Sequence, residues 1–156
     1  MKVEKQIITH KTVDISIKEI TLLSIEEFEQ YRNNIPSLDA RWWFRSPGYD
    51  SYRAAGIYID GSVYHRGDYV NLDNRVVRPV IVIQLDSNLQ IGDKIELVGY
   101  TWTMIAKNMA LCDKGVGQTY FRKDSEASDA NVYEKSDVKK WLKAWAQERG
   151  IEIETD

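Results

Sequence analysis

Residues 41–79 read RWWFRSPGYDSYRAAGIYIDGSVYHRGDYVNLDNRVVRP, and this stretch is the most informative part of the chain. It holds eight of the seventeen aromatic residues and six arginines, whereas no lysine occurs between Lys18 and Lys94. Tyrosine and tryptophan offer large, rigid contact areas at low entropic cost, and arginine presents a planar fork of donors that also stacks on rings. Glycine and aspartate recur at positions that suit turns. The composition predicts a recognition surface carried on short strands.

Within this stretch, small and β-branched residues alternate with aromatic and charged residues. A sheet needs the first kind for packing, while turns can present the second kind to a partner. We expect one exposed face over a rigid frame built by Trp43, Ile57, Val63 and Val80. The candidate binding residues on that face are Tyr49, Tyr52, Arg53, Tyr58, Tyr64, Arg66 and Tyr69. If these side chains instead scatter over opposite faces, the segment is scaffold.

Two short motifs at the ends of the stretch favour structural roles. Trp42, Trp43 and Phe44 are consecutive on a predicted strand and must face both of its sides, and side chains of this size favour the core. Arg45 and Arg78 are expected to bridge to backbone carbonyls or carboxylates, because one guanidinium can satisfy several acceptors. These residues are therefore predicted to hold the frame together.

Most of the chain outside the helices has the pattern of short strands. Residues 55–59 and 62–65 predict a hairpin, because Asp60-Gly61 suits a type I′ turn. Residues 76–83 form a β-branched run typical of a strand buried on both faces, and Pro79 within it predicts a bulge or an edge because proline cannot donate to a ladder. Further predicted strands are residues 94–98 and 101–106, a hairpin around Gly99-Tyr100, and residues 110–112.

Two segments have helix signatures. Ser24 and Glu27 form a capping box that predicts a helix to about Asn33. Ser136 is the predicted N-cap of a second helix, which Gly150 ends. This helix has one apolar stripe at helical spacing, predicted to face inward: Val138, Trp141, Leu142 and Trp145. Lys139, Lys140 and Lys143 are predicted to stay in solvent, residues 122–134 form a surface loop, and the fold class is α+β.

Composition indicates an ordinary globular protein with 156 residues, 43% hydrophobic content and a net charge of −3. This length suits a single domain covering residues 1–156. The acidic balance argues against a general nucleic-acid binder. The charged N-terminus shows no signal peptide, and no apolar run suggests a membrane span. With one cysteine, a cytoplasmic location is the expectation, for a protein of a cell or of a virus growing in one.

The chain offers little for catalysis, and we expect no enzyme, no cofactor and no metal. His10 and His65 are the only histidines, and neither has a metal-ligand spacing with Cys112. Cys112 follows Ala-Leu in a predicted strand and is interpreted as a buried small hydrophobe. The acidic residues 124–137 lack the glycine and spacing of a calcium-binding loop and are interpreted as a solvated face.

Two motifs carry a family resemblance: Trp42-Trp43-Phe44-Arg45-Ser46-Pro47-Gly48 and Val77-Arg78-Pro79-Val80, with Gly61 and Gly67 between them. They resemble the WWLRSPG and VRPAL elements of the DUF6273 family, which occurs in Firmicutes and their prophages. Residues 20–27 are similar to the helix entry that precedes WWLRSPG in that family. Phe44 stands where the family has leucine.

Residues 91–105 resemble the opening of the same family, and residues 110–112 and 133–142 resemble what normally follows that opening. Here these elements come after the VRP motif, so the order resembles a circular permutation with a junction near residues 86–88. The resemblance covers about residues 20–142. It implies that the halves 1–86 and 87–156 share one core, which is possible where chain ends lie close together.

The Trp-Trp and Arg-Pro motifs are also similar to the C-type-lectin-like fold of formylglycine-generating enzymes and of the variable proteins of diversity-generating retroelements. The catalytic cysteines of those enzymes have no counterpart near the motif, so the resemblance implies display on a rigid scaffold. We therefore expect a non-enzymatic recognition module that binds a protein or a small, possibly anionic, ligand. The alternative is a small phage or prophage inhibitor of a bacterial defence protein or of its nucleotide signal.

Overall fold

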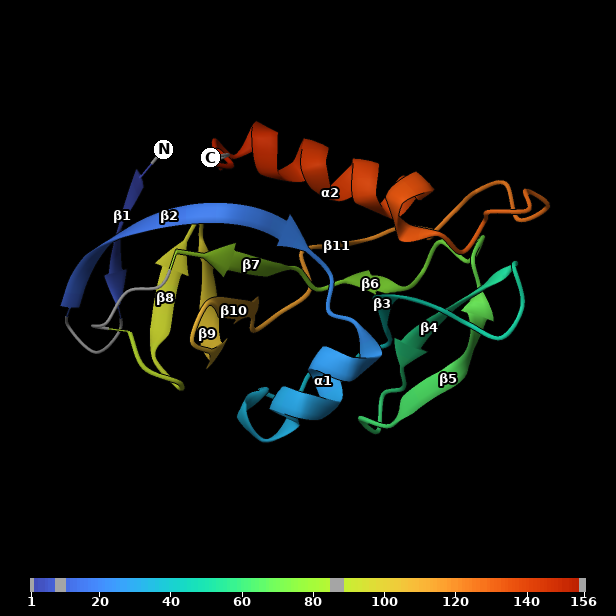
Figure 1. Cartoon of the computed structure of the whole chain (residues 1–156), viewed down its shortest axis with the longest axis horizontal. Coiled ribbons are helices and arrows are strands. Elements are labelled where there is room, and N and C mark those ends of the chain that lie inside the picture. The colour runs from blue at the N-terminus through green and yellow to red at the C-terminus, as the bar shows by residue number, and fades with distance from the viewer. Residues whose placement is uncertain (1, 8–10, 85–88, 155–156) are drawn as a thin grey trace.

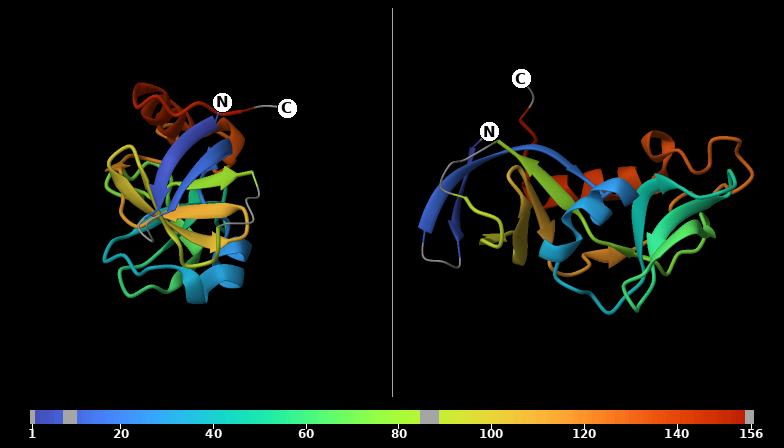
Figure 2. Two further views of the ribbon diagram at one scale, coloured as in Figure 1. Left: turned by 90° about the vertical axis from the view of Figure 1, so that its left-hand side faces the viewer. Right: turned by 60° about the horizontal axis from the view of Figure 1, so that its bottom comes forward.

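The computed structural model describes residues 2–7, 11–84 and 89–154, and it places them in two curled sheets with two α-helices (Figure 1). One sheet is a closed barrel with the strand order β1-β2-β7-β10-β9-β8, and the other has the order β11-β6-β3-β4-β5. The further views show the barrel at one end of the molecule and the second sheet at the other (Figure 2). Pairing is antiparallel except between β3 and β6. The α+β prediction is confirmed.

The barrel strands are β1 (Lys2–Ile7), β2 (Lys11–Thr21), β7 (Val80–Ile83), β8 (Lys94–Leu97), β9 (Tyr100–Ala106) and β10 (Met109–Cys112). The second sheet contains β3 (Trp42–Pro47), β4 (Arg53–Ile57), β5 (Val63–Tyr69), β6 (Val76–Val77) and β11 (Gly117–Gln118). The helices are α1 (Ile25–Tyr31) and α2 (Asp137–Glu148), with the short 3-10 helices η1 (Arg32–Asn34) and η2 (Tyr133–Lys135). Helix α2 packs beside β2, and α1 packs beside β3.

Both sheets contain strands from the two parts of the chain. In the barrel, β7 pairs with β10 and β1 pairs with β8, so N-terminal strands neighbour C-terminal strands. In the second sheet, β11 pairs with β6. The two parts therefore share both sheets, and the single domain expected for them remains a prediction. The proposed junction at residues 86–88 lies outside the described residues, and the permutation relative to the family remains a prediction.

The three consecutive aromatic residues of β3 separate two hydrophobic clusters. Trp42 and Phe44 point to one side and pack against Phe28 of α1, with ring centroids 5.8 and 5.3 Å from it. Trp43 belongs to the other cluster and packs edge-on against Phe121 at 5.6 Å. All three are buried, so β3 is a central strand with core on both faces.

The β-branched run at residues 76–83 forms two strands, where the sequence predicted one. β6 belongs to the second sheet and β7 to the barrel, with Arg78-Pro79 between them. Pro79 contributes its carbonyl, which accepts from the Cys112 amide at 2.9 Å, but it has no N–H to continue a ladder. The proline therefore marks the point where the chain passes from one sheet to the other.

Both predicted hairpins are present, with turns that differ from the prediction. The Gly61 amide donates to the Tyr58 carbonyl and the Tyr58 amide donates to the Ser62 carbonyl, each at 2.9 Å. Only Gly61, with φ of 85°, has a left-handed backbone there, so the type I′ prediction is wrong and a three-residue connection forms. The hairpin β8–β9 instead turns through Val98 and Gly99, both with positive φ, one residue before the predicted site.

The helix starts are as predicted. Ser24 and Glu27 form the reciprocal capping box, and Ser136 accepts from the Lys139 amide at 3.1 Å. On α2, the side chains predicted to face inward are buried except for one. Trp141 is only partly buried. Its ring lies over β11 and is so close to Gly117 that a Cβ at this glycine would be 2.6 Å from the ring. Lys140 and Lys143 are exposed, and Lys139 is half-buried.

Candidate functional site

The predicted binding residues lie on or next to the hairpin β4–β5, except for Tyr49 in the turn between β3 and β4. Strand β5 is the outer strand of its sheet. The first group forms where β4 begins and β5 ends, because Arg53 pairs in register with Tyr69. The Tyr52 and Tyr69 rings stack with centroids 6.0 Å apart and planes 19° apart. Their residues are 40% and 49% exposed, which leaves one side of the pair open to a partner.

Arg53 lies beneath this pair. Its guanidinium carbon is 4.5 Å from the Tyr69 ring centroid and 5.5 Å from that of Tyr52, and the residue is only 9% exposed. Nη1 donates to the Gly67 carbonyl and Nη2 to the Tyr69 hydroxyl, both at 3.3 Å. Nε lies 3.3 Å from an Asp50 oxygen but makes no hydrogen bond. The structure thus places Arg53 as the support of the tyrosines.

The second group lies near the turn of the same hairpin. The Tyr58 and Tyr64 rings stack at 4.6 Å, and the Arg41 guanidinium lies 5.2 Å from the Tyr58 ring centroid. Burial raises the pKa of Tyr58, and the hydrogen bond with Tyr64 and the charge of Asp68 act in the same direction. Both tyrosines are half-buried, so this group offers less accessible ring area than the first.

The two remaining candidates flank the first group. Tyr49 is 76% exposed, and its amide donates to the Arg66 carbonyl at 2.9 Å. Arg66 is also exposed. The structure brings Tyr52, Arg53 and Tyr69 together. Among the described residues no ring or polar contact joins that group to Tyr58 and Tyr64, and the shared face of all seven remains a prediction.

An open depression of about 600 Å³ adjoins the first group. Asn71 lines it beside Tyr52 and Tyr69, together with three residues that the sequence analysis missed: Ser51, Ser125 and Glu126. The loop carrying Ser125 is tied to the β3–β4 turn, because Asn131 donates to the Asp50 carbonyl at 3.0 Å. No local signal could reveal this, since Asn131 and Asp50 are 81 residues apart and the acidic loop was interpreted as a solvated face.

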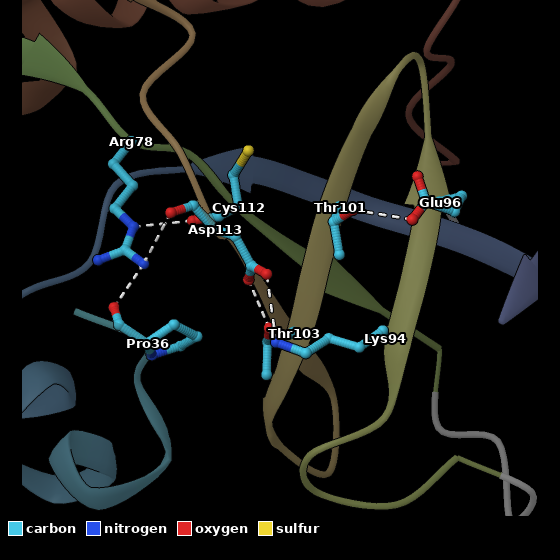
Figure 3. Close-up of polar contacts among 8 residues, drawn as sticks. All are labelled: Pro36, Arg78, Lys94, Glu96, Thr101, Thr103, Cys112 and Asp113. Atoms are coloured by element: carbon cyan, nitrogen blue, oxygen red, sulfur yellow. Dashed lines mark hydrogen bonds and ion pairs between the residues drawn. The ribbon is translucent and has the colours of Figure 1, made fainter. Parts of the chain in front are cut away.

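The motif arginines bridge separate segments. Arg45 Nη1 donates to the Leu22 carbonyl at 2.7 Å and to Glu27 at 2.5 Å, which joins β3 to the start of α1. Arg78, only 1% exposed, donates through Nε to the Cys112 carbonyl at 2.7 Å (Figure 3). Its Nη2 donates to the Pro36 carbonyl at 2.7 Å and to the Asp113 carbonyl at 3.3 Å.

A polar cluster continues from Arg78 onto the barrel (Figure 3). The Asp113 carboxylate accepts from the Thr103 hydroxyl and from Lys94, the latter at 3.2 Å. Lys94 also donates to the Thr103 hydroxyl at 2.5 Å. The carboxylate is thus occupied by its own neighbours, and Arg78 reaches only the carbonyl of Asp113.

Cys112 is fully buried, as predicted, and burial raises the pKa of its thiol to about 11. A thiol that stays protonated is a poor nucleophile. Across the part of the chain that the structure describes, no group of three or more His, Cys, Asp or Glu side chains is arranged to hold a metal ion. No helix in that part is long and apolar enough to cross a bilayer.

Comparisons with models of protein families, with curated proteins and with solved structures found no match to this chain. The similarity of its motifs to DUF6273 therefore remains a prediction from the sequence.

Proposed function

We propose that this chain is a non-enzymatic recognition domain that binds a partner protein through the Tyr52–Tyr69 pair and the depression beside it. The observation that carries the proposal is a stacked pair of tyrosines, each close to half exposed, held over a buried arginine. Tyrosine is enriched at the centres of interfaces, where a few residues supply most of the binding energy.

The support of the pair matters as much as its exposure. Because Arg53 stacks under both rings and bonds to the Gly67 carbonyl, the tyrosines are held in place before a partner arrives. A preorganised side chain loses less conformational entropy on binding than a free one. The wide depression suits the side chains of a protein surface better than a small molecule, which is normally enclosed on most sides.

The proposal includes the scaffold and the location. We propose a C-type-lectin-like role for the second sheet, in which turns display contact residues over a rigid frame, and a cytoplasmic place of action. Trp43, buried between β4 and β6, supports this frame, and its Nε1 donates to the Thr119 carbonyl at 2.9 Å.

The experiment is a quantitative affinity capture from bacterial lysate with the wild-type protein and with Tyr52→Ala/Tyr69→Ala. The double variant should weaken binding of the captured protein at least about tenfold, as expected when about 1.4 kcal/mol is lost. Ile91→Ala, which trims another exposed large side chain away from the hairpin, is the matched control and should bind as wild type. Equal capture by all three proteins would refute the proposed site, provided that their melting temperatures agree.

A further inference from the structure

A second pocket lies away from the tyrosine pair, between α1, the loop of residues 35–39 and the strands β3 and β4. Its volume is about 330 Å³, within the range of small-molecule sites. The side chains of Phe28, Trp42 and Ile57 give it apolar walls, and Arg32 and Arg78 also line it. An apolar pocket with a few converging polar groups is the usual form of a ligand site.

Arg78 is the unusual component of this pocket. A guanidinium has five N–H donors, and three hydrogen bonds run from Nε and Nη2 to the carbonyls of Cys112, Pro36 and Asp113. Among the described residues no acceptor bonds to Nη1, and in Figure 3 this nitrogen points away from Asp113. One end of a buried cation therefore remains available.

The charge of Arg78 also lacks a counter-ion. Among the described residues no carboxylate forms an ion pair with it. The Asp113 carboxylate pairs with Lys94, and its charge offsets only part of the effect of burial on the Arg78 pKa. Burial lowers the pKa of Arg78 to about 10, so the group still carries its charge at neutral pH. A buried charge is costly unless it is paired and fully hydrogen-bonded. An anion in the pocket would supply both the opposite charge and the missing hydrogen-bond acceptor.

We propose that this pocket binds a small organic carboxylate, whose anionic group pairs with Nη1 of Arg78 and whose apolar part lies against Phe28 and Trp42. Arg78 is held for this role, because its guanidinium lies 5.1 Å from the Trp42 ring centroid and bonds to three carbonyls. Arg32 adds a second cation, and its Nη2 donates to the Gly61 carbonyl at 3.1 Å.

The other charged residues that line the pocket favour a ligand with a single negative charge. Asp39 and Asp60 also line the pocket, so its two arginines are balanced by two carboxylates. The Asp60 side chain accepts from the amide and hydroxyl of Ser62 and is engaged in its own turn. A monoanion can pair with the buried arginine, whereas a dianion such as phosphate would place excess negative charge beside the aspartates.

The test is a titration of the ¹⁵N-labelled full chain with acetate, benzoate and phenylacetate, each matched with its uncharged amide. The Nε–H signal of Arg78 and the indole N–H signal of Trp42 are followed by NMR. At least one carboxylate should produce a saturable shift of both signals, and its amide should bind at least about tenfold more weakly. Inorganic phosphate should bind more weakly than that carboxylate.

Two matched variants locate the site. Arg32→Gln should weaken the carboxylate about two- to fivefold, as expected for an exposed charge, whereas Arg41→Gln, outside the pocket, should leave binding unchanged. Arg78→Lys should abolish the shift of the Trp42 signal. If that variant fails to fold, the comparison of each acid with its amide in the wild-type protein tests the proposal. Absence of saturable binding for all three acids, equal affinity of acid and amide, or tighter binding of phosphate would overturn the proposal.

Discussion

A single side chain, Arg78, joins three segments that are distant in sequence: the loop before β3, the β6–β7 junction and the end of β10. We expect Arg78→Met to lower the free energy of unfolding by about 3 kcal/mol, because one buried and two partly buried carbonyls lose a charged donor. Urea unfolding measures this loss. Arg41→Met, which removes an exposed arginine, should cost about 0.5 kcal/mol or less, and similar losses in both variants would contradict the bridging role.

At the scale of elements, the hairpin β4–β5 depends on the glycine in its second strand. Gly67 has φ of 91°, and a Cβ there would lie 2.7 Å from the Ala54 carbonyl oxygen. Gly61 has a similar φ but open space around it. Both Gly→Ala changes carry the left-handed cost of about 1–2 kcal/mol, and only Gly67→Ala adds a clash with backbone. Gly67→Ala should therefore have the lower melting temperature, and equal values would show that the strand relaxes freely.

The start of α1 should make stability depend on pH. Burial raises the pKa of Glu27, but hydrogen bonds from Arg45 and from the Ser24 amide, together with the Arg45 charge, outweigh burial and leave it below its ordinary value of 4.5. A carboxyl with a lowered folded-state pKa stabilises the protein above the unfolded-state pKa, and the stabilisation is lost as pH falls through the folded-state value.

We therefore expect the free energy of unfolding of the wild type to fall below about pH 4.5 more steeply than that of Glu27→Gln. Urea titrations at several pH values measure the two slopes. Glu26→Gln, an exposed neighbour in the same helical turn, is the control and should keep the wild-type slope. Identical slopes for wild type and Glu27→Gln would show that the capping box does not couple folding to protonation.

The sequence predicted helices and strands well where a single interaction between nearby residues determines them. The caps at Ser24 and Ser136 were readable because a side chain meets an amide three residues away. The strand β2 was missed, although the buried Ile15 and Ile17 alternate within it, because charged residues are interspersed throughout the N-terminal region. The division of residues 76–83 between two sheets was also missed, since β-branched propensity cannot show which neighbours a strand will find.

The candidate sites were also hard to predict, because they depend on contacts between residues that are distant in sequence. Tyr52 and Tyr69 were identified from composition, but their stacking and the buried place of Arg53 depend on the β4–β5 register. The pocket at Arg78 was not foreseen, because it combines α1, β3, β4 and a loop that tertiary packing brings together. Sequence pattern thus indicated which residue types would act, and topology determined where they meet.

At the scale of the whole molecule, the sharing of both sheets between the two parts of the chain predicts that neither part folds alone. A fragment of residues 1–86 would leave β7 without β10 and β6 without β11, and a fragment of residues 87–156 would leave β8 without β1. Each would expose core side chains, such as Ile81 in the first and Trp102 in the second, that belong to one buried cluster. We expect both separate fragments to lack a cooperative thermal transition.

Mixed in equal amounts, the fragments should recover the near-ultraviolet circular dichroism of the intact chain, because the barrel and the second sheet each need strands from both. The same mixture prepared with Trp102→Ala in the C-terminal fragment should associate more weakly, since removal of a fully buried tryptophan costs about 3–5 kcal/mol. A fragment of residues 1–86 that melts cooperatively by itself would mean that the second sheet and α1 form an independent unit, and the shared core would then be an interface between two domains.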